Sequence, residues 1–543
     1  MMPGRSVFPV LSGRVPAARA VSTRGLDLDA FAQDLARDGI LAPDCTPQTF
    51  KAARQYIGRT VPAHAPAAVY AQFPAQFLTV PAARIAELER DRHLADARLH
   101  PGIASGTEVV VANAGEHTLV QALLARDGRG DIRVTVDPGQ PPALMRLGDD
   151  GGLDWTVART LDSLEGADDL SAFRRYGVER AGPVMTAFAQ WALDRLRAHG
   201  LSRCFGVMRE GRHLTEVMRA LGQPDGPFVG ELWLSRYVAL KAAITDGAAD
   251  ALPNLLWRAQ RRPLTVRAAL AMLSVDGPPD CPFGTDDPVD AARAPLFIDW
   301  LARSGLMEQV LAHAAELRRR LIRHLSDCGA LDGSGAPIVL IDMGYAANIQ
   351  RALETCLRAE AIAVPTIGLY MVTGPGVLWA QREGCRVSGY LTQNGVPEDF
   401  MAAFSRTPEV LELCAGDHRG SLVGFGPTGQ PELAGGSYAP PQWRQMRAVQ
   451  EGTLAFARLW AAGGRQSPPA AVVRDRVRAL LEAPTLAEAE HIGAWAYDTN
   501  GGTSQWRRLT DCAGDPARAG RDELYWPEAA RLLRAPGHRK AGV

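Results

Sequence analysis

The sequence predicts an α/β protein whose central region is organised around a mostly parallel sheet. Between residues 161 and 430, short apolar segments alternate with longer segments whose apolar residues recur about every 3.6 positions. The most apolar short segment, PIVLID at residues 337–342, lacks alternating polar positions, as expected for a strand buried on both faces. This alternation favours a parallel sheet with helices on both sides.

Four strands are predicted in the central region, and the first three are each followed by a turn and a helix. The first strand comes after an amphipathic helix at residues 181–200. A long, mainly helical insertion at residues 252–325 separates the second strand from the third. The predicted strands are residues 202–208, 229–235, 337–342 and 365–372.

Composition changes along the chain predict four regions. A segment rich in glycine and proline at residues 424–441 closes the central region. An acidic segment at residues 147–169, predicted to be a loop, precedes it. We expect a flexible tail at residues 1–25, an N-terminal α/β domain at 26–160, the central α/β domain at 161–430 and a mainly helical C-terminal region at 431–543.

The N-terminal domain contains one strand, turn, helix and strand unit at residues 105–136, after a mainly helical, alanine-rich segment. Its turn lies where α/β proteins place ligands. The same composition suits an ordinary connection, so both interpretations stay open. The polar or small residues of this turn are Asn113, Gly115, Glu116 and His117.

The composition and the net charge limit the classes of function that the sequence predicts. Lysine and arginine number 59 against 60 aspartate and glutamate residues, so the net charge of -1 provides no field that attracts nucleic acid or anionic lipid. The eight cysteines occur singly, which is typical of free thiols in a reducing compartment. No apolar segment reaches the length of a membrane-spanning helix. We therefore expect a cytoplasmic protein with neither a nucleic-acid partner nor a membrane span.

The turn after the first central strand contains Arg209, Glu210, Gly211 and Arg212. A helix begins there, and a helix N-terminus offers unpaired N–H groups and a partial positive charge to an anion. The two arginines can hold phosphate through paired hydrogen bonds. The sequence thus predicts an anion site, and the alternative is an ordinary turn with a surface Arg–Glu pair.

Asp342 ends the most apolar strand and is expected at the carboxyl edge of the sheet. A carboxylate there can accept hydrogen bonds from two sugar hydroxyls or hold a Mg²⁺ ion bound to phosphates. The small residues that follow leave room for a ligand beside the backbone. The alternative is that Asp342 caps the next helix. The loop and helix start comprise Gly344, Tyr345, Ala346, Ala347, Asn348 and Gln350.

Other polar residues are expected near the same edge. Ser235 and Arg236 end the second central strand, so their side chains can face the same cleft. Later carboxylates are candidates for acid–base chemistry, although an exposed helix face carries glutamate routinely. These later residues are Glu398, Asp399, Glu409, Glu412, Asp417 and His418.

Three segments together resemble the transferase region of bacterial surface-polysaccharide proteins described as predicted HAD-superfamily hydrolases. The family pattern is a G-P-x-x-x-x-F-x-x-W helix, strands ending in R-D-G and S-R, and a D-I-G-W-x-G-T-I-Q turn. The resemblance covers roughly residues 175–425. The segments are GPVMTAFAQWALDRLRAHGLSRCFGVMREGRHLTEVM, ELWLSRYVAL and VLIDMGYAANIQRAL.

The resemblance implies a phosphoribosyltransferase-like, Rossmann-like fold, with phosphoribosyl diphosphate as donor and a separate HAD phosphatase as partner. By position, Arg209, Glu210 and Gly211 would form the pyrophosphate turn, and Asp342 would bind the ribose diol. Ser235 and Arg236 would form a supporting wall. The implied cradle of the 5-phosphate is Gly344, Tyr345, Ala347, Asn348 and Gln350.

The sequence departs from the family pattern at several of these positions. Glu210 stands where the family has aspartate, and Ala347 and Asn348 replace its Gly-Thr pair. The missing hydroxyl and glycine imply altered substrate choice or lost activity, although Asn348 can still donate a hydrogen bond. The hhhDxDx[TV] segment of a HAD phosphatase is absent, so hydrolase activity is not expected.

These observations predict a Mg²⁺-assisted glycosyltransferase that acts on a glycan or small-molecule acceptor. Asp342 would fix the ribosyl ring and bind the metal, while Arg209 would neutralise the departing diphosphate. The acceptor base would be Glu398, Asp399 or Glu409. Two alternatives are a non-catalytic module that binds a sugar phosphate or a partner in a glycan-assembly system, and a nucleotide-sugar-dependent transferase whose donor lies between the N-terminal and central domains.

Overall fold

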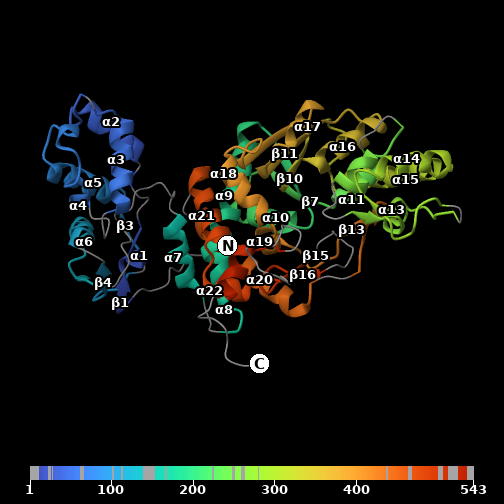
Figure 1. The fold of residues 1–543 in the computed structure, drawn as a ribbon. Helices are drawn as coiled ribbons and strands as arrows, with labels where there is room; N and C mark the ends of the chain where they lie inside the picture. Colours follow the sequence, from blue (N-terminus) through green and yellow to red (C-terminus); the bar gives the residue numbers. More distant parts are fainter. Residues whose placement is uncertain are drawn as a thin grey trace. The chain divides into compact units, whose positions relative to one another are not determined.

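A computed structural model describes most of residues 12–534, and the chain forms two compact units. The first unit comprises Met1–Glu165 and Ala462–Val472, and the second comprises Gly166–Ala461 and Val473–Val543. Figure 1 labels their helices and strands. Within the described part, the gaps are residues 23–25, 27, 44, 61–65, 101–102, 112–113, 138–152, 165–167, 223–224, 247–250, 259–262, 279–280, 436–437, 463–466, 499–505 and 512–523.

The second unit is built on a five-stranded sheet in which all neighbouring strands are parallel (Figure 1). The strand order is β12-β11-β10-β6-β7, which places the most apolar strand, β10, at the centre. The predicted parallel sheet is confirmed, and one strand, β12, is additional. The strands are β6 (Arg203–Val207), β7 (Phe228–Leu232), β10 (Ile338–Tyr345), β11 (Thr366–Thr373) and β12 (Arg386–Thr392).

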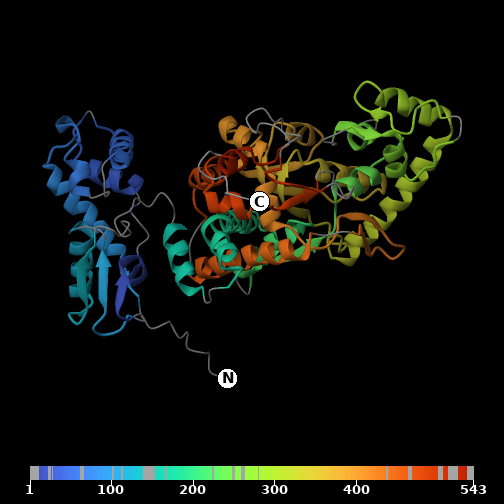
Figure 2. The same cartoon turned by 60° about the horizontal axis from the view of Figure 1, so that its bottom comes forward.

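Helices cover both faces of this sheet, as the alternation of strands and helices predicts (Figure 2). Phe205 of β6 shares a core with Leu240 of α11 and Leu353 of α16. The next residue, Gly206, faces the opposite side and approaches Thr215 of α10. The helices are α9 (Gly182–Ala198), α10 (Gly211–Leu221), α11 (Arg236–Ala242) and α16 (Asn348–Ala359).

The insertion in the second unit is mainly helical, as predicted. It also contains a short antiparallel ribbon of β8 with β9, which the helical prediction missed. Its principal elements are β8 (Leu264–Thr265), α13 (Val266–Leu273), β9 (Pro288–Val289), α14 (Ala294–Arg303) and α15 (Leu306–Asp327).

The predicted helices of the C-terminal region are present, together with an antiparallel ribbon of β15 and β16. Residues from Val473 onward belong to the same unit as the large sheet. The elements are α20 (Pro440–Ala462), α21 (Ala470–Glu482), α22 (Leu486–His491), β15 (Ala496–Asp498), β16 (Trp506–Arg508) and α23 (Pro527–Arg534).

The first unit contains a parallel sheet of order β1-β4-β5 and the predicted strand, helix and strand unit. β1 pairs with β4, so the predicted flexible tail is wrong for residues 14–22. The reason is burial, since Val15 joins the core that contains Val109. The elements are β1 (Arg14–Pro16), α1 (Ala17–Ala20), β2 (Val21–Ser22), β4 (Glu108–Val111), α6 (Ala114–Arg126) and β5 (Arg133–Val136).

Helices make up most of the rest of the first unit, as the alanine-rich pattern predicts. The segment predicted to be a loop at residues 147–169 contains a helix, α7, which buries Leu153, Thr156 and Thr160 on one side. The spacing of these three residues is helical, although acidic residues surround them. The helices are α2 (Leu28–Arg37), α3 (Pro47–Thr60), α4 (Pro66–Tyr70), α5 (Ala82–Asp96) and α7 (Leu153–Ser163).

Two general features of the described residues agree with the sequence. None of the described helices is both long enough and apolar enough to cross a membrane. The cysteines in the described part of the chain carry free thiols. Burial raises the pKa of Cys204, Cys356 and Cys414 to about 12, so these thiols are protonated and inert at neutral pH.

Candidate functional site

The adjacent strands β6 and β10 bring the two predicted turns together at the carboxyl edge of the large sheet. In their parallel register, Ile341 lies opposite Gly206. Asp342 is therefore level with the last residue of β6, close to the Met208–Arg209 peptide bond, which is cis. Asp342, predicted to share a site with Arg209, thus lies on the strand next to the one that precedes Arg209.

Asp342 occupies an electrostatically unusual position. Burial of the carboxyl group and the negative charge of Glu210 raise its pKa to about 7. The backbone N–H groups of Met343 and Gly344 and the guanidinium of Arg236 act in the opposite direction without cancelling this effect. The residue as a whole is partly exposed, although its carboxyl group is buried. Glu210 and Arg236 therefore lie near enough to Asp342 to act on its charge in opposite directions.

The end of β10 and the residues after it have a backbone that approaches its neighbours closely. Gly344 and Tyr345, predicted to lie in a loop, are the last two residues of the strand. Gly344, Tyr345 and Ala347 have positive φ values of 120°, 103° and 54°. A Cβ atom on Gly344 would collide with the carbonyl oxygen of Val372 on β11. Only glycine fits there, and α16 begins directly after Ala347, with Asn348 partly exposed at its first position.

Gly211 has a steric role that the sequence did not predict. It is the first residue of α10 and was expected to belong to the pyrophosphate turn. Its φ is not positive. A Cβ atom on Gly211 would lie 2.5 Å from the carbonyl carbon of Gly206 on β6. Its small size therefore allows α10 to pack directly against the strand.

Gly211→Ala is expected to lower the free energy of unfolding by about 2 kcal/mol, because the added methyl group forces helix and strand apart. Gly222, which follows the same helix, is the matched control. The nearest atom to a Cβ built on Gly222 is 3.4 Å away, so Gly222→Ala should be neutral or slightly stabilising. Urea denaturation of both variants tests this, and equal destabilisation would contradict it.

A third wall of the site comes from α19 (Glu409–Ala415), which packs against α10. Tyr497 on β15 donates a hydrogen bond from its hydroxyl to Oε2 of Glu412, at 2.7 Å. Burial, then Glu412, Glu409 and Glu210, raise the pKa of Tyr497 well above its ordinary value, and Arg209 lowers it. Glu409 is buried and Glu412 is half-buried. The predicted carboxylates Glu409 and Glu412 therefore lie near the Arg209 turn.

Gln350, predicted to help bind the 5-phosphate, has partners inside the protein. The amide of Gln350 is buried and donates to Oγ1 of Thr366 at 2.9 Å and to the carbonyl oxygen of Arg386 at 3.1 Å. It also accepts from the hydroxyl of Tyr370 at 3.0 Å. Gln350 therefore joins strands of the sheet and has no donor left for a phosphate, which corrects its predicted role.

Ser235 is the N-cap of α11, and its hydroxyl accepts from the backbone N–H of Val238. It also donates to the carbonyl oxygen of Leu422 at 2.9 Å. Arg236, the next residue, is exposed and acts on Asp342. The two residues predicted to form a supporting wall therefore have different roles. Ser235 caps α11, and Arg236 acts on the charge of Asp342.

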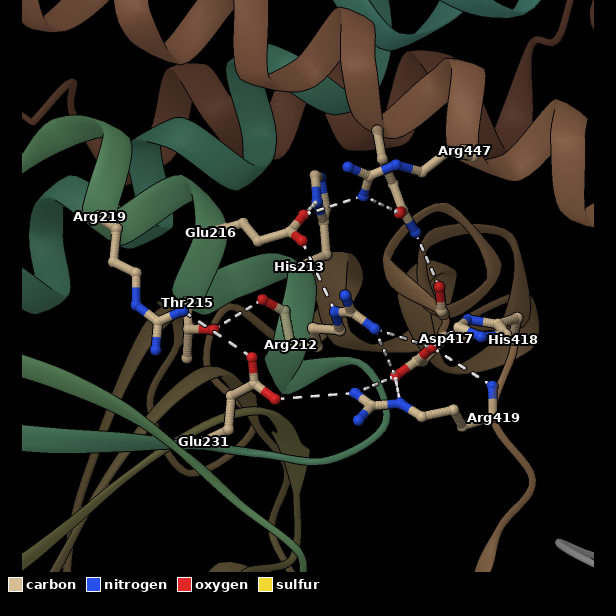
Figure 3. Close-up of polar contacts among 12 residues, drawn as sticks. Arg212, His213, Thr215, Glu216, Arg219, Glu231, Asp417, His418, Arg419 and Arg447 are labelled. Carbon is tan, nitrogen blue, oxygen red and sulfur yellow. Dashed lines mark hydrogen bonds and ion pairs between the residues drawn. The ribbon is translucent and has the colours of Figure 1, made fainter. Parts of the chain in front are cut away.

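Arg212 points toward Asp417 and Glu216 (Figure 3). Its Nη1 lies 3.5 Å from Oδ2 of Asp417, and its Nε lies 3.6 Å from Oε1 of Glu216. Asp417 is buried and also contacts His418 and Arg419. These ion pairs form a network that does not include Asp342. It contains Arg212, predicted to bind phosphate, and the acid–base candidates Asp417 and His418.

Further predicted residues lie elsewhere. Glu398 and Asp399 are exposed at the start of α18 (Glu398–Arg406), and Asp399 pairs with Arg478 at 2.8 Å. In the first unit, Gly115, Glu116 and His117 belong to the first turn of α6. Asn113 lies outside the described residues.

Sequence reasoning missed Tyr497, which lies among scattered C-terminal aromatic residues with nothing local to distinguish it. In the part of the chain that the structure describes, no three or more His, Cys, Asp or Glu side chains form a group able to hold a metal. No protein-family model matches the chain, and no curated protein matches it. The function must therefore be inferred from the positions of the residues around Asp342.

Proposed function

We propose that this protein is a glycosyltransferase of the phosphoribosyltransferase type. It transfers a ribosyl or phosphoribosyl group from phosphoribosyl diphosphate to a hydroxyl group of a glycan or small molecule. The observation that carries the proposal is the placement of Asp342 on β10 beside the Arg209 turn of β6. The sequence resemblance of residues 175–425 to the polysaccharide transferases supports the same assignment.

In the proposed reaction, the bond between the anomeric carbon and the diphosphate oxygen breaks, and the electron pair leaves with the diphosphate. Arg209 and the N-terminus of α10 would stabilise this charge. The acceptor oxygen forms the new bond to the anomeric carbon, and its proton passes to a base. Asp342 would accept hydrogen bonds from the ribose hydroxyls and orient the ring.

The carboxyl groups of Asp342 and Glu210 fit a magnesium ion shared with the donor. Their mutual repulsion, seen in the raised pKa of Asp342, would be relieved by a cation. Magnesium commonly binds one or two protein carboxylates together with substrate phosphates. The ion would supply charge neutralisation at the diphosphate when bound.

Acceptor-dependent release of pyrophosphate tests the proposal directly. The purified full-length protein is incubated with phosphoribosyl diphosphate, Mg²⁺ and a panel of sugar acceptors. Release that requires both an acceptor and an intact Asp342 supports the assignment. Equal release by the wild type and Asp342→Asn would refute it.

A non-catalytic sugar-phosphate-binding module is the second candidate. The observation that favours it is the left-handed Ala347 before Asn348, where neither a glycine nor a hydroxyl is available to the phosphate. Calorimetric titration with phosphoribosyl diphosphate separates the two candidates. Binding without any product in the presence of acceptors would favour the module.

Glu412 is the residue we expect to remove the acceptor proton, with Tyr497 positioning its carboxylate through the 2.7 Å hydrogen bond. Glu412→Gln should lower acceptor-dependent transfer by about a hundredfold, because general base catalysis typically contributes this much. Tyr497→Phe should lower it by about tenfold and shift the pH profile of transfer. Initial rates across pH measure both effects.

The control is Glu316→Gln on α15, since Glu316 is a partly exposed residue paired with arginines of its own helix. It should leave transfer unchanged. Donor affinity, measured by calorimetry, should also stay unchanged in Glu412→Gln. A loss of donor binding equal to the loss of transfer would contradict the role of Glu412 as a base.

A further inference from the structure

A buried lysine in the second unit, which has no role in the proposed transfer reaction, is hydrogen-bonded to uncharged oxygen atoms. Lys241 lies in the last turn of α11 and is 7% exposed. Its Nζ lies 2.6 Å from Oγ of Ser274 and 3.2 Å from the hydroxyl of Tyr237. It also lies 5.5 Å from the centroid of the Tyr237 ring. These contacts fix the position of the amine.

The buried arginine of α15, a helix that packs against α11, binds other groups. Arg318 of α15 donates to the carbonyl oxygens of Ala242 and Ile244 and pairs with Glu360. Among the described residues, no carboxylate forms an ion pair with Lys241. Burial lowers its pKa to about 8. A useful fraction of the amine is therefore neutral near physiological pH.

Ser274 and Tyr237 give the amine a route for protons. Ser274 ends α13 with a left-handed φ of 60° and is exposed to solvent. The amine is thus hydrogen-bonded to the hydroxyl group of a residue that is exposed to solvent. The hydroxyl of Tyr237 donates to the carbonyl oxygen of Met272 at 3.1 Å, so its own oxygen accepts from Lys241.

Composition makes the residue type at this position informative. The chain contains only three lysines, Lys51, Lys241 and Lys540, among its 59 basic residues. Arginine supplies nearly all the other positive charges, and a guanidinium does not lose its proton in proteins. Only an amine can become a neutral nucleophile at this position, and burial is the condition that makes it so.

We propose that Lys241 is a nucleophilic amine that forms an imine with a small aldehyde or ketone. The nitrogen attacks the carbonyl carbon, and a proton moves to the carbonyl oxygen to give a carbinolamine. Loss of water then forms the C=N bond, with Ser274 and Tyr237 transferring the protons. No oxidant or metal is needed. The proposal does not depend on the transferase function.

Reductive trapping tests it. The full-length protein is treated with glycolaldehyde and sodium cyanoborohydride between pH 6 and 10, and the modified peptides are quantified by mass spectrometry. Lys241 should react on the order of tenfold faster than Lys51 at pH 7.5, because more of its amine is neutral. Its rate should rise with a midpoint near pH 8, the pKa to which burial lowers this amine.

Two variants and one treatment complete the test. Lys241→Arg should abolish the fast modification, while Ser274→Ala should slow imine formation and leave the fold unchanged. Unfolding in urea should equalise the rates of the lysines. The proposal is overturned if Lys241 reacts no faster in the folded protein than in the unfolded one, or if Ser274→Ala reacts at the wild-type rate.

Discussion

Asp342→Asn is expected to stabilise the protein at pH 8 while it lowers transfer by on the order of a thousandfold. The pKa of Asp342 is raised from 3.8 to about 7. Its protonated form therefore favours folding, and this contribution is complete below about pH 4 and lost as pH rises through about 7. At pH 8 the buried charge costs the folded state about 2 to 4 kcal/mol, which asparagine removes.

Urea denaturation at pH 8 and at pH 4 measures this effect, because the difference between variant and wild type should vanish at the lower pH. Asp332→Asn is the matched control with the opposite sign. Asp332 pairs with Arg203, and that guanidinium holds the pKa of the carboxyl well below its usual range. Its replacement should lower stability and leave transfer intact. Destabilisation by Asp342→Asn at pH 8 would contradict the electrostatic account.

Ionised Asp342 lowers the stability of the folded protein unless a bound ligand compensates its charge. Burial and the neighbouring Glu210 both oppose ionisation of Asp342, and Arg236 compensates only in part. A bound cation or the hydroxyl groups of a sugar would relieve the cost. The predicted gain in stability and the predicted loss of transfer are therefore two consequences of one charge.

The fold was predictable where the sequence of a single strand or helix shows which of its residues are buried. β10 is apolar without interruption, so its place at the centre of a parallel sheet follows from its sequence alone. β12, with Arg386 and Ser388, was missed because polar residues interrupt its pattern. β1 was missed because a strand of three residues leaves almost no periodic signal, and its pairing with β4 depends on a partner far along the chain.

The site was predictable where residues follow a strand end and was not where contacts join distant segments. Asp342 lies beside the strand that precedes Arg209, and Arg236 acts on its charge, because parallel strands place their carboxyl ends at one edge. Tyr497 reaches the site from the C-terminal region, and no local spacing predicts such a contact. Gln350 fits the motif by position, but the structure uses its amide inside the sheet.

The first unit contains a buried ionic network whose loss should have the largest effect on stability. Arg54 of α3 donates to Glu89 of α5 at 3.0 and 2.7 Å, and the hydroxyl of Tyr70 also donates to this carboxylate. Burial alone would raise the pKa of Glu89, but His93 and Arg54 lower it to about 2. The stabilising contribution is therefore present at neutral pH and is lost as pH falls through about 2.

Glu89→Gln is expected to destabilise the first unit by about 3–5 kcal/mol, because it leaves the guanidinium of Arg54 buried without its counter-ion. Hydrogen exchange measured by mass spectrometry on peptides from α3, α4 and α5 reports this loss locally. Glu87→Gln, on the same helix but in an exposed pair with Arg84, should change exchange very little.

The double variant Arg54→Met with Glu89→Leu distinguishes an unpaired charge from a general loss of packing. Replacing both charges with apolar side chains of similar volume removes the desolvation cost together with the attraction. It should therefore recover most of the stability that Glu89→Gln loses. If the double variant is as unstable as the single one, the network contributes through its shape, and the electrostatic explanation of its stability fails.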